Sequence, residues 1–116
     1  MSKANDFLRM HTGSEMYYRS LMGYTYTEGV KDLADLFGAY WLIDLIVSYQ
    51  LHPQINRHDF QVWKLKRLHG DSFNAVCEDG NKVILVKKFI EYSDFKYDEA
   101  EIWIEGKTLL LPSEHY

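Results

Sequence analysis

Residues 24–50 read YTYTEGVKDLADLFGAYWLIDLIVSYQ, and this stretch decides the fold class. Thr27 is a candidate helix N-cap, and the apolar residues that follow it recur at helical spacing with charged residues between them. Gly38 interrupts the pattern, and residues 39–51 then form a second segment, apolar on almost every side, that ends before Pro53. Because a helix that is apolar all round packs inside a domain, we expect residues 39–51 to form the buried centre of the fold.

The second half of the chain has the two-residue period of β-strands. Residues 60–68 and 99–105 alternate apolar and polar side chains. Asp79 and Gly80 form a dipeptide that is typical of tight hairpins, so the flanking segments are expected to pair antiparallel. Helices followed by strands predict one α+β domain over residues 1–116, with N-terminal helices packed on a C-terminal antiparallel sheet of four or five strands.

Two finer expectations follow from the same patterns. The segment before residue 24 predicts a short helix, capped by Thr12 or Ser14 and ended by Gly23. The expected core joins the apolar faces of these helices and strands: Leu33, Phe37, Trp41, Leu42, Leu45, Ile46, Tyr49, Val62, Val76, Ile84, Val86, Ile102, Ile104 and Leu110.

Composition narrows the class of protein. The chain is 47% hydrophobic and 16% aromatic, which is typical of a globular domain. Its formal charge of -4 disfavours general nucleic-acid binding and suits a partner with a basic surface. A single cysteine, Cys77, excludes an intramolecular disulfide, and the start of the chain lacks the apolar region of a signal peptide. Since Asp44 cuts the longest apolar run, we expect no membrane span and a cytoplasmic protein.

Metal binding and catalysis find little support. The histidines, at positions 11, 52, 58, 69 and 115, lack the spacing of zinc ligands, so we expect no metal and no cofactor. His58 beside Asp59 could form an oriented base, but no serine or cysteine nucleophile is identifiable near it. Cys77 shares a strand face with Phe73 and Ala75, which indicates a buried apolar side chain rather than a reactive thiol. We therefore expect a protein that is not an enzyme.

Asp44 leaves two interpretations open, because it interrupts the apolar run WLIDLIV. An unpaired carboxylate is costly in an apolar site, so Asp44 could be bonded to Arg19, a tyrosine hydroxyl or backbone N–H groups. Alternatively, it is a perturbed acid in a pocket lined by Tyr17, Tyr18 and Tyr40. An Asp44→Asn change would lower stability in the first case and abolish an activity in the second.

Charge is unevenly distributed between two of the expected strands. Residues 60–68 are basic, whereas residues 91–105 hold six acidic residues and one lysine. If Ala100 and Ile102 face the core, the period of two places Trp103 outside, among glutamates. An exposed tryptophan ringed by charge has the composition of an interface hot spot. The candidate partner-binding residues are Asp98, Glu99, Glu101, Trp103 and Glu105.

Six segments together carry a resemblance to a known family. They are HTGSEMYYR (11–19), YTEGVKDLA (26–34), GAYWLIDLIVSYQ (38–50), VWKL (62–65), EYSDF (91–95) and LLLPSEHY (109–116). In this order they resemble an uncharacterised family of small bacterial proteins that often occur on phages, plasmids and other mobile elements. Its members more often end in LPSEY, which His115 interrupts here. The resemblance implies no assigned activity and no catalytic or ligand residues.

The resemblance and the charge pattern together suggest three functions. The leading hypothesis is a non-enzymatic inhibitor from a mobile element. It would block a host defence protein with a basic surface, such as a CRISPR effector subunit, through the acidic strand. The second is a nucleic-acid-binding accessory module that uses the basic strand at residues 60–68, with Trp63 and its lysines holding a single strand. The third is a small enzyme with Asp44 and His58 as acid and base. The sequence does not exclude a homodimer.

Overall fold

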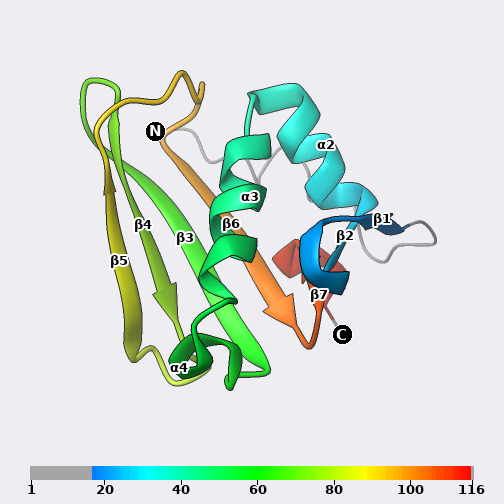
Figure 1. Ribbon diagram of the computed structural model, residues 1–116. Coiled ribbons are helices and arrows are strands. Elements are labelled where there is room, and N and C mark those ends of the chain that lie inside the picture. The colour runs from blue at the N-terminus through cyan, green and yellow to red at the C-terminus, as the bar shows by residue number, and fades with distance from the viewer. Residues whose placement is uncertain (1–16, 116) are drawn as a thin grey trace.

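The protein is a seven-stranded sheet with its helices on one side (Figure 1). This computed structural model describes residues 17–115. The strand order is β1-β2-β7-β6-β3-β4-β5, and every pair is antiparallel except β2 with β7. The strands are β1 (Tyr17–Arg19), β2 (Thr25–Thr27), β3 (Phe60–His69), β4 (Ser72–Glu78), β5 (Ile84–Ile90), β6 (Glu99–Glu105) and β7 (Thr108–Leu110).

The helices lie in the middle of the chain, between β2 and β3. They are α2 (Glu28–Phe37), α3 (Tyr40–Tyr49) and the short α4 (Pro53–Asn56). Thr27 caps α2 as predicted, since its hydroxyl accepts a hydrogen bond from the N–H of Val30 at 3.3 Å. Gly38 ends α2 in the left-handed conformation, with φ at 67°, which a glycine adopts without strain. None of these helices is long and apolar enough to cross a membrane within the described residues.

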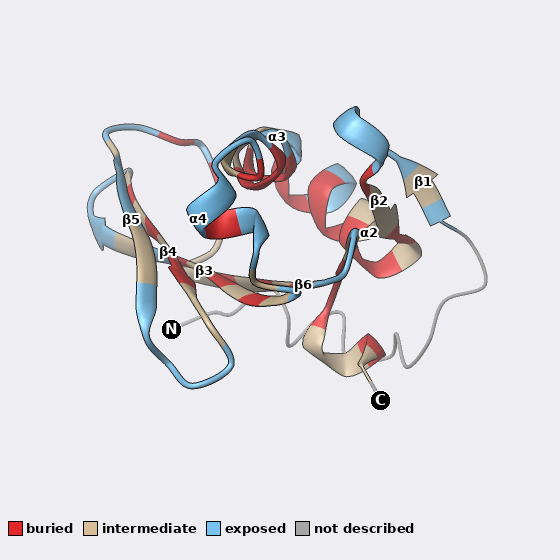
Figure 2. Cartoon of the chain, turned by 60° about the horizontal axis from the view of Figure 1, so that its bottom comes forward, coloured by how far each residue is buried: buried red, intermediate tan, exposed pale blue. Residues whose placement is uncertain are grey.

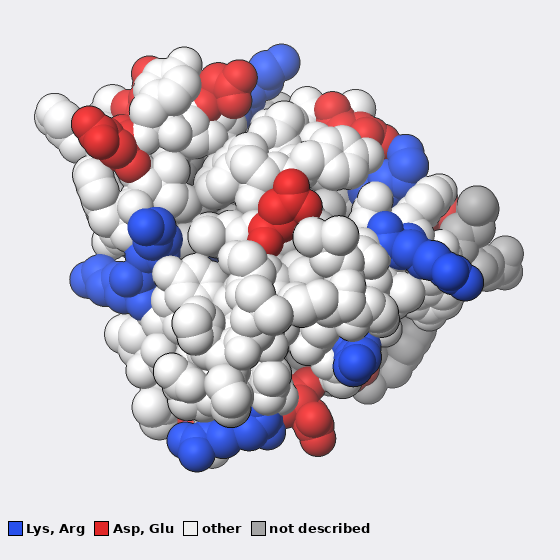
Figure 3. Space-filling view, in the orientation of Figure 1, with Lys and Arg blue, Asp and Glu red and all other residues white. Residues whose placement is uncertain are grey.

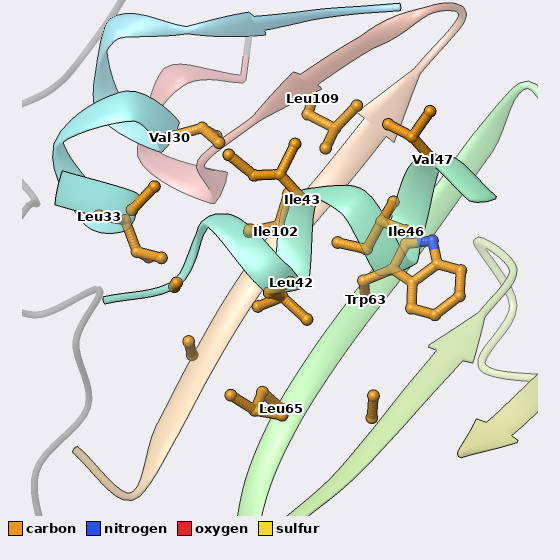
Figure 4. Packing of buried hydrophobic residues seen from close by; sticks show 14 of the residues in the cluster. Val30, Leu33, Leu42, Ile43, Ile46, Val47, Trp63, Leu65, Ile102 and Leu109 are labelled. Atoms are coloured by element: carbon orange, nitrogen blue, oxygen red, sulfur yellow. The ribbon is translucent and has the colours of Figure 1, made fainter. Parts of the chain in front are cut away.

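The core lies between α3 and the sheet (Figure 4). The buried face of α3 places Leu42, Ile43 and Ile46 against the central strands. Trp63 of β3 and Ile102 of β6 point up from the sheet to meet them. All five side chains are at most 3% exposed, so this layer holds the best-packed part of the molecule.

Helix α3 packs at the centre of the core as expected, but one side of it is exposed. Tyr40, Asp44 and Ser48 are exposed, and their spacing of four residues places them on one strip of the helix. The sheet covers only one face of α3, and its partner α2 reaches only part of the rest (Figure 2). Three apolar neighbours at the edge of the strip, Trp41, Leu45 and Tyr49, are partly buried against the core.

The helix predicted before residue 24 is also wrong over its described part. This segment forms strand β1 and the 3-10 turn η1 (Leu21–Gly23), which leads into β2, whereas the proposed caps Thr12 and Ser14 lie outside the described residues. Strand β2 pairs in parallel with β7, with Thr25 opposite Thr108. A partner more than 80 residues away therefore adds β2 to the sheet, and β1 pairs in turn with β2, so local spacing does not reveal either strand.

The sheet is larger than expected and is not a simple meander. The prediction of an α+β domain is confirmed, but β1 and β2 come from the N-terminal half and raise the sheet to seven strands. Strand β6 pairs with β3 rather than with β5, so residues 91–98 carry the chain back across the sheet. The antiparallel hairpin of β4 and β5 is confirmed, but its turn is longer than two residues. The N–H of Asp79 donates to the carbonyl of Val83 at 2.9 Å, and the positive φ of 66° falls on Lys82.

The core prediction is correct for the helices, β6 and Leu110, and Val86 of β5 packs partly against the core, but the predicted phase of β3 and β4 is wrong. Val62 and Val76 lie on the face away from the helices, and Ile84 is 59% exposed. Their neighbours Trp63 and Cys77 face the core instead, and each is at most 2% exposed. A shift of one residue moves every side chain of a strand to the other face, because the strand period is two.

Candidate interaction surface

The sheet face that lies away from α2 and α3 is here called the outer face. Its side chains follow from the strand register and from the alternation of burial. They are Phe60, Val62, Lys64 and Lys66 of β3, Asn74, Val76 and Glu78 of β4, Ile84, Lys87 and Phe89 of β5, and Glu99, Glu101, Trp103 and Glu105 of β6. Within the described part of the chain, the short C-terminal turn η2 (Pro112–Glu114) is the helical element on this side (Figure 2).

Trp103 lies on the outer face, as the alternation of β6 predicts, but it is half-buried rather than fully exposed. Its ring meets the ring of Phe60 edge-on, with 5.3 Å between centroids, and that of His115 at 5.1 Å. Its indole N–H donates to the carboxylate of Glu101 at 2.6 Å. These contacts restrain the position of the indole on the outer face.

The outer face carries both signs of charge. The register places Lys64 opposite Glu101 and Lys66 opposite Glu99, so the basic strand and the acidic strand are neighbours. Lys64 also forms an ion pair with Glu78 at 3.3 Å. The glutamates of β6 and β4 therefore lie beside the lysines of β3 on this face.

Two further candidate residues are engaged in contacts within the chain. The carboxylate of Glu105 lies 2.6 Å from Nε2 of the His115 imidazole. Asp98 accepts a hydrogen bond from Nε of Arg67 at 3.1 Å. Arg67 also donates to the carbonyl groups of Gly70 and Phe95, at 2.6 and 2.8 Å. Asp98 thus helps Arg67 to hold the crossing loop at residues 91–98, and this structural role was not predicted from the sequence.

A buried polar cluster explains how β3 is held to the helices. The side-chain amides of Gln50 and Gln61 donate to each other, both at 2.9 Å. Gln61 also accepts the indole N–H of Trp63 at 3.0 Å and donates to the carbonyl groups of Ile55 and His58. Because Trp63 is 2% exposed and hydrogen-bonded here, its ring cannot stack on a base, and the predicted nucleic-acid site at residues 60–68 loses its aromatic platform.

A second buried cluster joins the C-terminal motif LPSE to the start of α2. The carboxylate of Glu114, 5% exposed, accepts hydrogen bonds from the hydroxyl of Thr27 at 2.6 Å and from the N–H of Gly29 at 3.3 Å. It also accepts the N–H of Leu111 at 2.9 Å. A negative charge at a helix N-terminus is favourable because the free N–H groups there carry partial positive charge. Two of the segments that carry the family resemblance, YTEGVKDLA and LLLPSEHY, therefore contain residues that stabilise the fold.

The structure separates the residues proposed for an enzyme. Asp44 is exposed on α3, so neither the buried pairing nor the tyrosine-lined pocket describes it. His58 follows α4 and is partly exposed, and its Nε2 is buried with no hydrogen-bond partner among the described residues. Two surface hollows, of about 410 and 360 Å³, include neither Asp44 nor His58 in their lining.

Cys77 is a buried apolar side chain, as predicted. It is 0% exposed, and burial raises the pKa of its thiol to about 12. Because the thiolate is the reactive form, a thiol with so high a pKa is inert at neutral pH. Within residues 17–115, His, Cys, Asp and Glu side chains form no group of three that could hold a metal ion.

Comparison with known proteins places the chain in a family. No curated protein and no solved structure matches it. Residues 2–115 match the model of a family of unknown function, DUF6876. This range covers nearly the whole chain, so the resemblance to an uncharacterised family is confirmed, and the protein belongs to DUF6876.

Proposed function

We propose that this protein is a non-enzymatic inhibitor that binds another protein through the outer face of its sheet. The observation that carries the proposal is the position of Trp103 in the acidic row of β6, which consists of Glu99, Glu101 and Glu105. The indole is half-buried, held by Phe60 and His115, and bonded to Glu101. Partly exposed tryptophans with fixed geometry are frequent anchors of protein interfaces.

The proposed partner is a host defence protein with a basic surface, such as a CRISPR effector subunit. The acidic side chains of β6 and the net charge of -4 favour a basic partner, and opposite charges accelerate its association. The restriction to a defence protein rests on the resemblance to proteins carried by mobile elements. The lysines of β3 beside the acidic row would add specificity, because they repel a partner whose basic groups are displaced by one strand.

The test compares variants of the outer face with a matched variant on the helical face, which is the side of the sheet that α2 and α3 cover. The protein is used to capture partners from a host lysate, and the affinity for each purified partner is measured by calorimetry. We expect Trp103→Ala to weaken binding by roughly 2 kcal/mol or more, which is the scale of an interface anchor. Glu99→Lys should slow association and reduce its dependence on salt. Asp44→Lys, an equal charge change at an exposed site on α3, is the control and should leave binding unchanged.

The stability of each variant separates binding from folding. Trp103 is half-buried against two rings, so Trp103→Ala should lower the free energy of unfolding by about 1–3 kcal/mol, less than a fully buried tryptophan would. Trp103→Phe keeps an aromatic ring and removes the N–H donor, and it should bind with intermediate affinity. If Asp44→Lys weakens binding while Trp103→Ala and Glu99→Lys do not, the partner contacts the helical face and the proposal is wrong.

A further inference from the structure

Strand β5 is apolar in sequence and yet has no buried residue. Its seven residues read ILVKKFI, and each is exposed or of intermediate exposure. Ile84 is 59% exposed and Phe89 is 56% exposed. The neighbouring strand β4, in contrast, alternates buried and half-buried positions along its length. Three of its apolar side chains, Leu85, Val86 and Ile90, pack partly against the core, whereas Ile84 and Phe89 stay exposed, so the core covers β5 only in part.

The position of β5 at the end of the sheet explains this exposure. Helix α3 crosses β3 and β6, and β5 lies outside the layer that it covers (Figures 1 and 2). Among the described strands β5 pairs with β4 alone, so its other edge carries backbone N–H and C=O groups that no described strand meets. Such an edge is a template for an additional strand.

Two lysines mark the middle of this edge. Lys87 lies opposite Val76 on the outer face and Lys88 lies opposite Ala75 on the helical face, so the pair flanks the edge on both sides of the sheet. Both side chains are exposed, and neither forms an ion pair with another residue of the described chain. Figure 3 shows basic side chains gathered on the left of the molecule, where β5 lies.

Lysines also protect edge strands from unwanted pairing, and here they select the class of partner. A second copy that paired antiparallel with all of β5 would place Lys87 opposite its own symmetry mate. Like charges directly opposite each other are destabilising. The same two lysines attract a strand that carries acidic side chains at the matching positions, while Ile84 and Phe89 supply exposed apolar surface at the two ends.

We propose that β5 is a docking edge for an extended acidic segment of another protein, which adds to the sheet as a further strand. The segment would carry two adjacent acidic residues, one facing Lys87 and the other facing Lys88, with apolar residues on either side. Main-chain hydrogen bonds would supply affinity, and the two charges would supply register and specificity. Strands β3 and β4 separate β5 from β6, so variants of Lys87 and Lys88 test this proposal and variants of Trp103 test the proposed function separately.

The probe is a synthetic ten-residue peptide in which two adjacent glutamates are flanked by alternating valine and threonine. Its binding to the full chain is followed by fluorescence anisotropy, and the amides that shift are located by NMR. We expect the amide signals of β5 to shift and those of β1 at the opposite edge to remain. A matched peptide with two lysines in place of the glutamates should bind with an affinity at least about tenfold lower.

Charge reversal on the protein gives the decisive comparison. In the double variant Lys87→Glu, Lys88→Glu, the affinity for the glutamate peptide should fall by about tenfold or more. The affinity for the lysine peptide should rise by a similar factor. This exchange of preference shows that the variant is folded. Lys107→Glu, which changes an exposed lysine in the turn between β6 and β7, is the control and should bind both peptides as the wild-type protein does.

Backbone methylation separates strand addition from simple charge attraction. Alternate N–H groups of a strand point to opposite edges, so peptides methylated on one set of alternate amides should bind and those methylated on the other set should not. Equal binding of both methylated peptides would refute strand addition. Equal binding of the glutamate and lysine peptides would refute the role of the lysines. A wild-type protein that dimerises through β5 in sedimentation experiments would show that the occupant is a second copy, and the proposal would be wrong.

Discussion

Replacing Gly29 by alanine tests whether the C-terminal motif stabilises the start of α2. Glycine in a helix is ordinarily unfavourable, so Gly→Ala alone would stabilise α2 by about 1 kcal/mol. At this position, however, the added Cβ would lie 2.7 Å from Oε1 of Glu114 and 2.8 Å from Cδ1 of Leu111. Both neighbours are buried, at 5% and 1% exposure, so neither can turn away into solvent.

The expected effect is a net loss of stability. Overpacking of a buried site costs about 1–3 kcal/mol. Displacement of the Glu114 carboxylate would also weaken its hydrogen bonds to Thr27 and to the N–H of residue 29, and a hydrogen bond to a charged group contributes about 1.5–3 kcal/mol. After subtraction of the gain in helix propensity, we expect Gly29→Ala to lower the free energy of unfolding by about 2–4 kcal/mol.

The assay is urea unfolding of four proteins that form a double-mutant cycle: the wild type, Gly29→Ala, Glu114→Ala and the double variant. Glu114→Ala removes the obstructing oxygens, and Leu111 can then move into the vacated space. In that background Gly29→Ala should cost less than about 1 kcal/mol or even stabilise the protein, so the coupling between the two sites is large. Stabilisation by Gly29→Ala in the wild-type protein would contradict this account. An equal loss of unfolding free energy in the wild-type and Glu114→Ala backgrounds would contradict it as well.

Three other outcomes can be measured with single variants. Gln61→Leu should lower the free energy of unfolding by about 3–5 kcal/mol in urea titrations, because it leaves several buried polar groups without partners; a neutral effect would show that water replaces the amide. The Cys77 thiol should resist Ellman's reagent at pH 8 until denaturant is added, and rapid labelling of the native protein would contradict its burial. Burial raises the pKa of this thiol to about 12 in the folded protein, against about 8.5 in the unfolded chain. The contribution of the protonated thiol to the free energy of unfolding is therefore complete below about pH 8.5 and declines as the pH rises towards 12. Arg67→Lys should cost about 1–2 kcal/mol in the same titrations, since lysine keeps the charge but cannot bond the carbonyl groups and Asp98 together; full stability of this variant would mean that the loop at 91–98 does not depend on the guanidinium.

The elements with local signals could be predicted from the amino-acid sequence alone. The Thr27 cap, the break at Gly38 and the period of two in β3 and β6 each depend on residues within a few positions of one another. The α+β class and the outward direction of Trp103 follow from these patterns, because helix spacing and strand alternation reflect which face is buried. The acidic and basic composition of the two strands is likewise visible without a structure.

The buried face of each element and its neighbours in the sheet depend on long-range contacts and could not be predicted. The parallel pairing of β2 with β7 and the placement of β6 beside β3 join segments far apart in the chain, and no local pattern encodes them. The phase of β3 and β4 depended on whether Trp63 or Val62 met the helices, and both are apolar, so alternation alone left the choice undetermined. Asp44 looked buried because its neighbours in sequence are apolar, yet a helix packed on one face leaves a strip in water. Long-range strand pairing also sets the place of each strand in the sheet. It puts the glutamates of β6 beside the lysines of β3, and it puts β5 at the end of the sheet, beyond the helices.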